Sequence, residues 1–197
     1  MNINAAFVGG GNMGGALIRG LIARGLSPQQ ISVGEAHQQR RIALADELGV
    51  HVTADNREAV ASADVVVLAV KPQDMAGTVQ ALADVFAQRQ PLVLSIAAGI
   101  RVADIVSWCG PGVAVVRAMP NRPALNSAGA TAMFAPASLS DAHRGLAADV
   151  LGAVGTTEAA LRSFDSANLR GIVAAAISAA ADRSRELAQA FGKKKQP

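Results

Sequence analysis

Short apolar runs alternate with amphipathic segments through the first 155 residues of the chain. The runs have the length of buried strands, and the predicted strands are 5–8, 31–33, 50–52, 64–70, 92–96, 113–117 and 129–134. The predicted helices are 16–23, a helix that ends at 48, 55–61, 75–89, 102–108, and 140–151 with Ser140 as its N-cap. Strands that alternate with helices indicate an α/β fold with a Rossmann-like, mostly parallel sheet covered by helices on both faces.

The character of the chain changes after Gly155. Segments 157–164 and 166–191 predict two helices, and the second contains two runs of three alanines. Such small residues permit close contacts between helices, so this region is suited either to packing against another chain or to covering its own sheet. We therefore expect a first domain over 1–155 and an all-helical segment over 156–197.

The first strand runs directly into a glycine-rich turn, and a helix follows. Gly9, Gly11 and Gly14 have the spacing G-x-G-x-x-G, in which the first glycine permits the tight turn and the second lets a pyrophosphate approach the backbone. The third allows the helix to pack closely on the sheet, and the free N–H groups at the helix start then face the phosphates. In this strand, turn and helix context, the motif predicts that 1–155 is a dinucleotide-binding domain.

The second strand ends near Glu35, about twenty residues after the turn, where a carboxylate accepts hydrogen bonds from the ribose hydroxyls of NAD. The same charge repels a 2′-phosphate. Arg40 and Arg41 follow in the next helix and are either phosphate contacts for NADP or residues of a solvated helix face. The sequence favours NAD and leaves NADP open.

Three later strands end in small or polar residues. Lys71 and Pro72 follow the strand 64–70, the segment 95–99 reads Ser-Ile-Ala-Ala-Gly, and 117–121 reads Arg-Ala-Met-Pro-Asn. Ligands of open α/β sheets bind at the carboxyl ends of the strands, so these residues are expected to border one crevice. Lys71 is the candidate cation there for a cofactor or substrate contact.

The histidines His37, His51 and His143 are scattered, and no serine elbow or carboxylate pair is present, so hydrolytic chemistry is not indicated. A bound cofactor is therefore expected to carry the reaction.

The composition narrows the classes of function. Hydrophobic residues make up 51% of the chain and aromatic residues only 3%, so the core must be aliphatic. The formal charge of +3 comes partly from lysines 193–195, and without aromatic stacking residues it disfavours nucleic-acid binding. The single cysteine, Cys109, excludes an intrachain disulfide, and no Cys/His cluster predicts a metal site. No signal-peptide pattern or membrane-spanning run is found, so we expect a soluble cytoplasmic protein.

Five stretches give the chain a strong resemblance to pyrroline-5-carboxylate reductase, the last enzyme of proline biosynthesis. They are FVGGGNM at 7–13, AVKPQ at 69–73, SIAAGI at 95–100, VRAMPN at 116–121, and GTTEAA at 155–160 with RSREL at 183–187. The resemblance implies an oxidoreductase that transfers a hydride from NADPH or NADH to 1-pyrroline-5-carboxylate and yields L-proline. It also implies a homo-oligomer, in which a helical domain interlocks with a partner subunit.

The resemblance also implies roles for individual residues. Thr157 would hydrogen-bond the substrate, Asn121 is a second candidate, and Lys71 would contact cofactor or substrate. The residues expected to line the cofactor are Val8, Gly9, Gly10, Gly11, Asn12, Met13, Glu35, Asn56, Ala69, Val70, Lys71, Pro72, Ile96, Ala97 and Ala98.

Two departures from the family pattern matter. Arg122 stands where the family usually has a threonine after Met-Pro-Asn. Gly155 is followed at once by the Thr156-Thr157 motif, and the family's Ser-Gly-Ser-Gly-Pro-Ala stretch is absent. The resemblance therefore implies that the middle of the helical domain is missing and that the substrate pocket is compromised. The alternative is a catalytically impaired or inactive NAD(P)-binding module derived by internal deletion; a β-hydroxyacid-dehydrogenase-like reductase fits these motifs less well.

Overall fold

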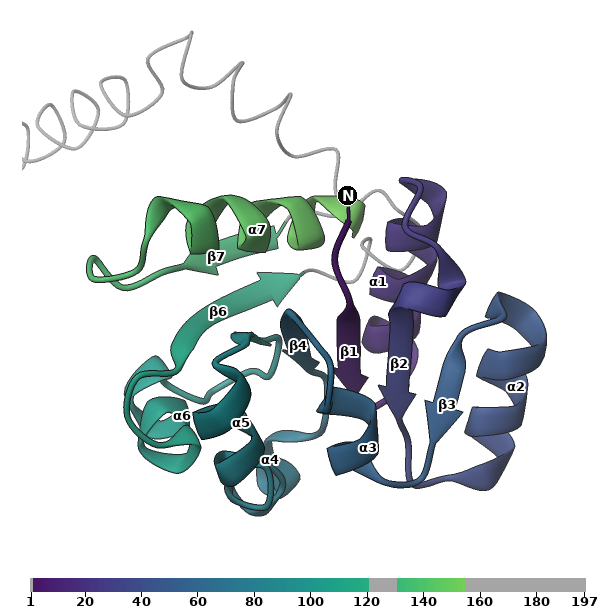
Figure 1. The fold of residues 1–197 in the computed structure, drawn as a ribbon, viewed down its shortest axis with the longest axis horizontal. Helices are drawn as coiled ribbons and strands as arrows, with labels where there is room; N and C mark the ends of the chain where they lie inside the picture. The colour runs from purple at the N-terminus through teal and green to yellow at the C-terminus, as the bar shows by residue number, and fades with distance from the viewer. Residues whose placement is uncertain (1, 121–130, 155–197) are drawn as a thin grey trace, which may run out of the picture. The chain divides into compact units, whose positions relative to one another are not determined.

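The computed structural model describes residues 2–120 and 131–154, which lie in one of the two units into which the chain divides, Met1–Thr157. Within these residues the strands form one sheet in the order β3-β2-β1-β4-β5-β6-β7 (Figure 1). Neighbouring strands are parallel throughout, except that β6 and β7 are antiparallel. The strands are β1 Ala5–Val8, β2 Ile31–Gly34, β3 His51–Thr53, β4 Val65–Leu68, β5 Leu92–Ser95, β6 Ala114–Pro120 and β7 Thr131–Phe134. The predicted mostly parallel, Rossmann-like sheet is confirmed.

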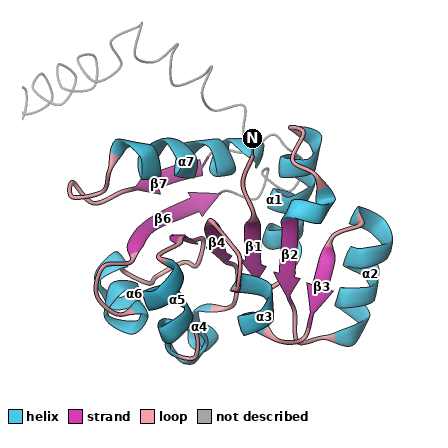
Figure 2. Ribbon diagram, in the orientation of Figure 1, coloured by secondary structure: helices cyan, strands magenta, loops and turns pink. Residues whose placement is uncertain are grey.

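Helices connect the strands and cover the sheet on both faces (Figure 2). The α-helices are α1 Asn12–Ala23, α2 Gln38–Leu48, α3 Asn56–Val60, α4 Pro72–Gln80, α5 Ala83–Arg89, α6 Val102–Cys109 and α7 Asp141–Leu151. Two short 3₁₀ helices, η1 Pro28–Gln30 and η3 Gly152–Val154, complete the described elements.

The alternation of side chains along β1 divides the core into two layers. Ala5 and Phe7 belong to the cluster that packs under α1, α2 and α7. Ala6 and Val8 belong to the cluster on the opposite face, which packs under α3, α4, α5 and α6. All four residues are buried. A strand that is apolar at every position is typical of a sheet covered on both faces, which explains the continuous runs in the sequence.

One predicted helix is wrong in its extent. The segment 75–89, expected as a single helix, forms two helices, α4 and α5. Arg57 of α3 supplies a physical reason, because its Nη1 donates to the Ala81 carbonyl oxygen at 2.8 Å and to Asp84 Oδ1 at 2.6 Å. These bonds come from a distant segment and fix the backbone at the junction. Helix α4 begins at Pro72, where a backbone N–H would have no partner within the helix, so proline is tolerated there.

Other boundaries differ by a few residues. Helix α1 begins at Asn12, four positions before the expected start at 16, and β6 extends to Pro120. Ser140 caps α7 as predicted, since its Oγ accepts the His143 N–H at 3.2 Å. The helices expected at 157–164 and 166–191, and the domain boundary at 155, lie outside the described residues and stay predictions.

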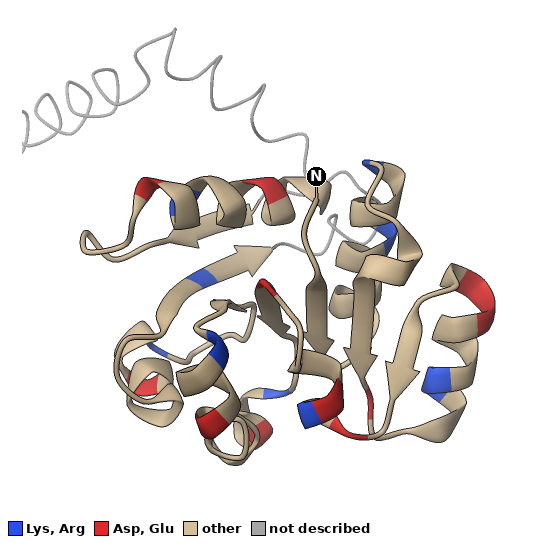
Figure 3. Ribbon diagram, viewed as in Figure 1, with Lys and Arg blue, Asp and Glu red and all other residues tan. Residues whose placement is uncertain are grey.

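Charges of both signs share the same helices in the described part of the chain. Figure 3 shows acidic and basic residues together on α2, α3 and α7. No helix within 2–120 and 131–154 is long and apolar enough to cross a membrane. Over the same ranges, no group of three or more His, Cys, Asp and Glu residues is arranged to hold a metal ion.

Candidate functional site

The carboxyl ends of the central strands lie in register at one edge of the sheet. Val8 at the end of β1 pairs with Gly34 of β2 and with Leu68 of β4, and Leu68 pairs with Ser95 of β5. The strand order reverses direction between β1 and β4, because β2 and β3 continue on one side and β5 to β7 on the other. Such a switch point is where open α/β sheets bind their ligands.

The glycine turn after β1 is held tightly against this edge. Gly9 has a φ of +102°, which favours glycine, and its N–H donates to the Gly34 carbonyl oxygen at 2.8 Å. A Cβ on Gly9 would lie 2.8 Å from the Ala69 carbonyl oxygen, and one on Gly14 would lie 2.7 Å from the Gly9 carbonyl oxygen. The folded chain itself therefore requires glycine at both positions.

Gly11 differs from these two glycines. It is the N-cap of α1 with an extended backbone, φ −68° and ψ −173°, and a Cβ added there would meet no atom within 4 Å. Helix α1 also has no side-chain cap and no acidic residue in its first turn. The chain thus leaves open space before exposed N–H donors at the positive end of a helix, which fits the pyrophosphate of a dinucleotide.

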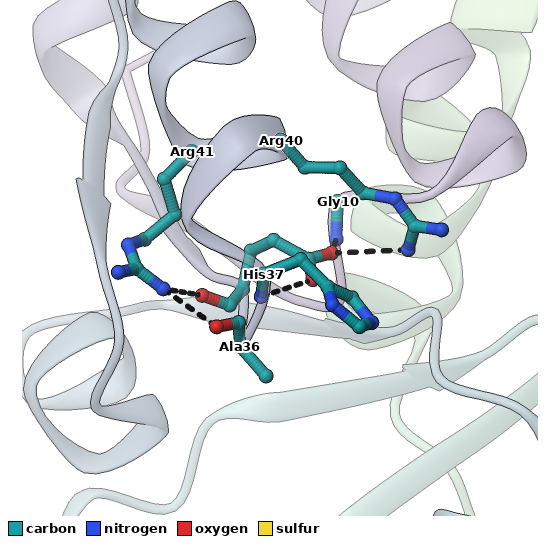
Figure 4. A network of polar contacts seen from close by, with 6 residues as sticks. Gly10, Ala36, His37, Arg40 and Arg41 are labelled. Atoms are coloured by element: carbon teal, nitrogen blue, oxygen red, sulfur yellow. Dashed lines mark hydrogen bonds and ion pairs between the residues drawn. The ribbon is translucent and has the colours of Figure 1, made fainter.

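Glu35 reaches from the end of β2 to the glycine turn. Its Oε2 accepts the N–H of Gly10 at 2.9 Å, and its Oε1 accepts the N–H of His37 at 2.9 Å (Figure 4). The residue is only 5% exposed. The carboxylate therefore joins the β2–α2 turn to the glycine turn, a role that the sequence did not predict.

The two arginines of α2 have different environments. Arg41 Nη1 donates to the carbonyl oxygens of Glu35 at 2.7 Å and Ala36 at 2.8 Å (Figure 4). Arg40 is 56% exposed, and its Nη1 lies 3.9 Å from Glu35 Oε2. The Arg41 side chain thus anchors the backbone of the β2–α2 turn, a role that neither expectation had named, and a phosphate contact stays a prediction.

Asn56, expected at the cofactor, packs against Gly34. A Cβ on Gly34 would overlap Asn56 Oδ1 and lie 3.1 Å from Asn56 Cα. Gly34 therefore leaves the room that Asn56 needs beside the candidate site, and sequence reasoning missed this residue. Its signal was a glycine directly before the acidic residue at the end of the second strand.

The expected residues after β4 and β5 adjoin this edge. Ala69 donates its N–H to the Val8 carbonyl oxygen at 2.9 Å, and Ile96 donates to that of Leu68 at 3.2 Å. Ala97 is buried and donates to the Oγ of Ser95, whose side chain is fully buried, at 3.4 Å.

Lys71 is exposed and forms the N-cap of α4, where its carbonyl oxygen accepts the Asp74 N–H at 3.0 Å. Asn121 and Thr157, the other catalytic candidates, lie outside the described residues, and so does Arg122. The structure thus brings the expected cofactor-lining segments to one edge of the sheet, while the assigned roles stay predictions.

Two family models match the chain. The model described as NADP oxidoreductase coenzyme F420-dependent matches residues 4–99, and the model described as pyrroline-5-carboxylate reductase dimerisation matches residues 114–187. Among curated proteins, pyrroline-5-carboxylate reductase of Pseudomonas aeruginosa is 46% identical over 150 residues, which are 76% of this chain and 55% of that protein. The Haemophilus influenzae protein of the same name is 41% identical over 153 residues, 77% of this chain and 55% of its own length.

Solved structures of proteins with the same name are also similar to this chain. A pyrroline-5-carboxylate reductase from Coxiella burnetii is similar with a TM-score of 0.76 and 39% identity, over 79% of this chain and 57% of that one. The Plasmodium falciparum pyrroline carboxylate reductase with NADP bound has a TM-score of 0.68 and 21% identity over 78% and 56% of the two chains, and at that identity shows the fold alone. The present chain spans about half the length of the curated relatives that it matches.

Proposed function

The chain belongs to the pyrroline-5-carboxylate reductase family, and from this premise we propose that it reduces 1-pyrroline-5-carboxylate to L-proline with NADPH or NADH. The observation that carries the proposal is the open space before Gly11 at the uncapped start of α1. This space lies at the edge where the strand ends meet, so a dinucleotide bound there would follow the usual path across the sheet.

In this proposal the glycine turn and the first N–H groups of α1 bind the pyrophosphate. Glu35 accepts hydrogen bonds from the adenosine ribose, beside Asn56. The residues after β4 and β5, namely 69–72 and 96–98, border the nicotinamide half, and the small side chains of Ala97 and Ala98 let a planar ring approach the backbone.

The reduced nicotinamide, when bound, supplies a hydride to the imine carbon of the substrate. A protonated imine is already electrophilic, so the protein needs mainly to hold the two reactants in a near-attack geometry. Thr157 donates a hydrogen bond to the substrate, with Asn121 and the exposed Lys71 as further polar contacts. No strong general base is required, which agrees with the scattered histidines of the chain.

The helical segment 156–197 is, in this proposal, a shortened form of the family's dimerisation domain. The match of residues 114–187 to the dimerisation model supports a homo-oligomer. We further propose that the enzyme acts on its small-molecule substrate in the cytoplasm, with neither nucleic acid nor membrane as a partner.

The test is a coupled measurement of turnover and binding on the full chain. Consumption of NADH and of NADPH is followed with 1-pyrroline-5-carboxylate, proline is identified as the product, and coenzyme binding is measured separately by calorimetry. Thr157→Val keeps the shape of the side chain and removes its hydroxyl, so we expect lower turnover with unchanged coenzyme binding.

Turnover to proline by the unchanged chain supports the proposal. Coenzyme binding without turnover overturns the reductase activity and supports an NAD(P)-binding module. A folded chain that binds neither coenzyme overturns both.

A further inference from the structure

We propose that this chain discriminates between the two coenzymes, binding NADH in preference to NADPH, and that Glu35 is the residue that discriminates. The inference rests on the proposed function, because it concerns the same dinucleotide site. It goes further because it names the preferred coenzyme and the carboxylate that determines this preference.

The first argument is that the Glu35 carboxylate is fixed in place. Each of its two oxygens accepts one backbone N–H at 2.9 Å, from Gly10 and from His37. Backbone N–H groups cannot follow a side chain that moves, and the half-buried Gly10 N–H would lose its acceptor if the carboxylate moved. Glu35 therefore cannot swing aside to make room for a second anion without losing both bonds.

The second argument is the position of this fixed charge. Glu35 directly follows Gly34, the last residue of β2, whose carbonyl oxygen holds Gly9 at 2.8 Å. Its Oε2 contacts Gly10 in the same turn. In dinucleotide-binding sheets the adenosine ribose lies at the end of this second strand, and a carboxylate here accepts a hydrogen bond from the 2′-hydroxyl. Each carboxylate oxygen has about two acceptor sites, so both retain capacity for a ribose hydroxyl.

The third argument concerns the cations nearby. An arginine near the ribose can accommodate a 2′-phosphate, but Nη1 of Arg41 already donates to the carbonyl oxygens of Glu35 and Ala36, and these bonds hold the side chain on the β2–α2 turn. Arg40 has its Nη1 3.9 Å from Glu35 Oε2, where its charge balances the carboxylate (Figure 4). A 2′-phosphate would have to compete for Arg40 with the Glu35 carboxylate, which is fixed in place. Like charges side by side are strongly unfavourable, so we expect a preference of about tenfold or more against the phosphate.

The experiment uses the adenosine halves of the two coenzymes, so that it does not depend on turnover. Calorimetry on the full chain compares ADP-ribose with 2′-phospho-ADP-ribose. We expect ADP-ribose to bind at least about tenfold more tightly. Equal binding, or tighter binding of the phosphorylated ligand, would overturn the inference while leaving the reductase proposal intact. Failure of both ligands to bind would instead overturn the proposed function together with this inference.

Two variants assign the effect to Glu35. Glu35→Gln keeps a carbonyl oxygen for one backbone N–H and removes the charge, and Glu35→Ser removes both acceptors and makes room. In each, we expect the affinity for 2′-phospho-ADP-ribose to rise relative to ADP-ribose by about tenfold.

Glu47→Gln is the control, because it removes a carboxylate of α2 that pairs with Arg19 at 2.7 Å and does not contact the glycine turn. We expect its ratio of affinities to equal that of the unchanged chain. Thermal denaturation checks that each variant folds, and Glu35→Gln keeps the test decisive if Glu35→Ser does not. A ratio that Glu35→Gln leaves unchanged would refute the role of the carboxylate.

Discussion

Gly20 of α1 lies directly against the backbone of Ala153 in η3. A Cβ built on Gly20 would overlap the Ala153 carbonyl oxygen and lie 2.7 Å from the carbonyl carbon. The obstacle is backbone, which cannot rotate away as a side chain would. The helix whose N-terminus faces the candidate pyrophosphate site is thus held in its last turn by the last described segment of the chain.

Gly20→Ala is therefore expected to destabilise the domain, by about 1–3 kcal/mol, because one added methyl group overpacks a closed contact. Urea unfolding measures the effect. Gly145→Ala in α7 is the matched control, since a Cβ there meets no atom within 4 Å. Alanine is the better helix former, so we expect the control to be neutral or stabilising by up to about 1 kcal/mol. Equal stabilities of the two variants would contradict the close contact.

Variants of Gly11 and Gly14 distinguish an effect on coenzyme binding from an effect on folding. In Gly11→Ala the added Cβ meets no protein atom, so we expect the free energy of unfolding to fall by less than about 1 kcal/mol, the usual cost of alanine at an N-cap. The Cβ would enter the space proposed for the pyrophosphate, so binding of NADH and NADPH should weaken at least about tenfold.

Gly14→Ala is the comparison for this prediction, because its Cβ would press on the Gly9 carbonyl oxygen at 2.7 Å. We expect it to lower both stability and binding. Calorimetry with each coenzyme and urea unfolding supply the two readouts. Unchanged coenzyme affinity in Gly11→Ala would mean that the open space is not the phosphate site.

The positions of the strands could be predicted from the sequence because each central strand is buried on both faces. A run such as 64–70 must then be apolar at every position, and this leaves a clear signal. The division of 75–89 into α4 and α5 left no such signal. The contacts at the junction come from Arg57, which precedes Asp84 by 27 residues and reaches both Ala81 and Asp84.

The candidate site also has features that could be predicted from the sequence and features that could not. The G-x-G-x-x-G spacing located Gly9 and Gly14, where the folded chain leaves no room for a Cβ, and Gly11, for which we propose that a ligand needs the space. The network of Glu35 was not predictable, since its acceptor role for the Gly10 N–H depends on how the ends of β1 and β2 meet. Every residue except proline has a backbone donor, so the sequence does not mark which of these donors a side chain will bind.

The pairing of Arg57 with Asp84 gives a dependence of stability on pH. The Arg57 guanidinium donates to both Asp84 oxygens at 2.6 Å, and these hydrogen bonds lower the pKa of Asp84 from 3.8 to about 2. A lowered pKa in the folded state means that the pair contributes its full stability above pH 3.8 and loses it as the pH falls towards about 2. Asp84→Asn should therefore be less stable than the unchanged chain near neutral pH, and the difference should shrink below about pH 4.

Urea unfolding at several pH values measures this difference. Both side chains are about half exposed, at 49% and 58%, so added salt should reduce it as well. Asp46→Asn, which removes an exposed carboxyl on α2, is the control for the general effect of charge. If the difference between Asp84→Asn and the unchanged chain stays constant down to about pH 2, the lowered pKa is refuted.

Cys109, the last residue of α6, is fully buried, and burial raises the pKa of its thiol from 9.0 to about 12. The thiolate is the reactive form, so a thiol reagent should modify the folded chain slowly at neutral pH and the unfolded chain completely. The rate of modification then reports how often α6 leaves the sheet. Because the unfolded thiol ionises first, stability should also fall as the pH rises from 9.0 towards about 12, and Cys109→Ala should lose this part of the slope. Modification of the native chain as fast as of the unfolded one would show that α6 does not cover this face of the sheet.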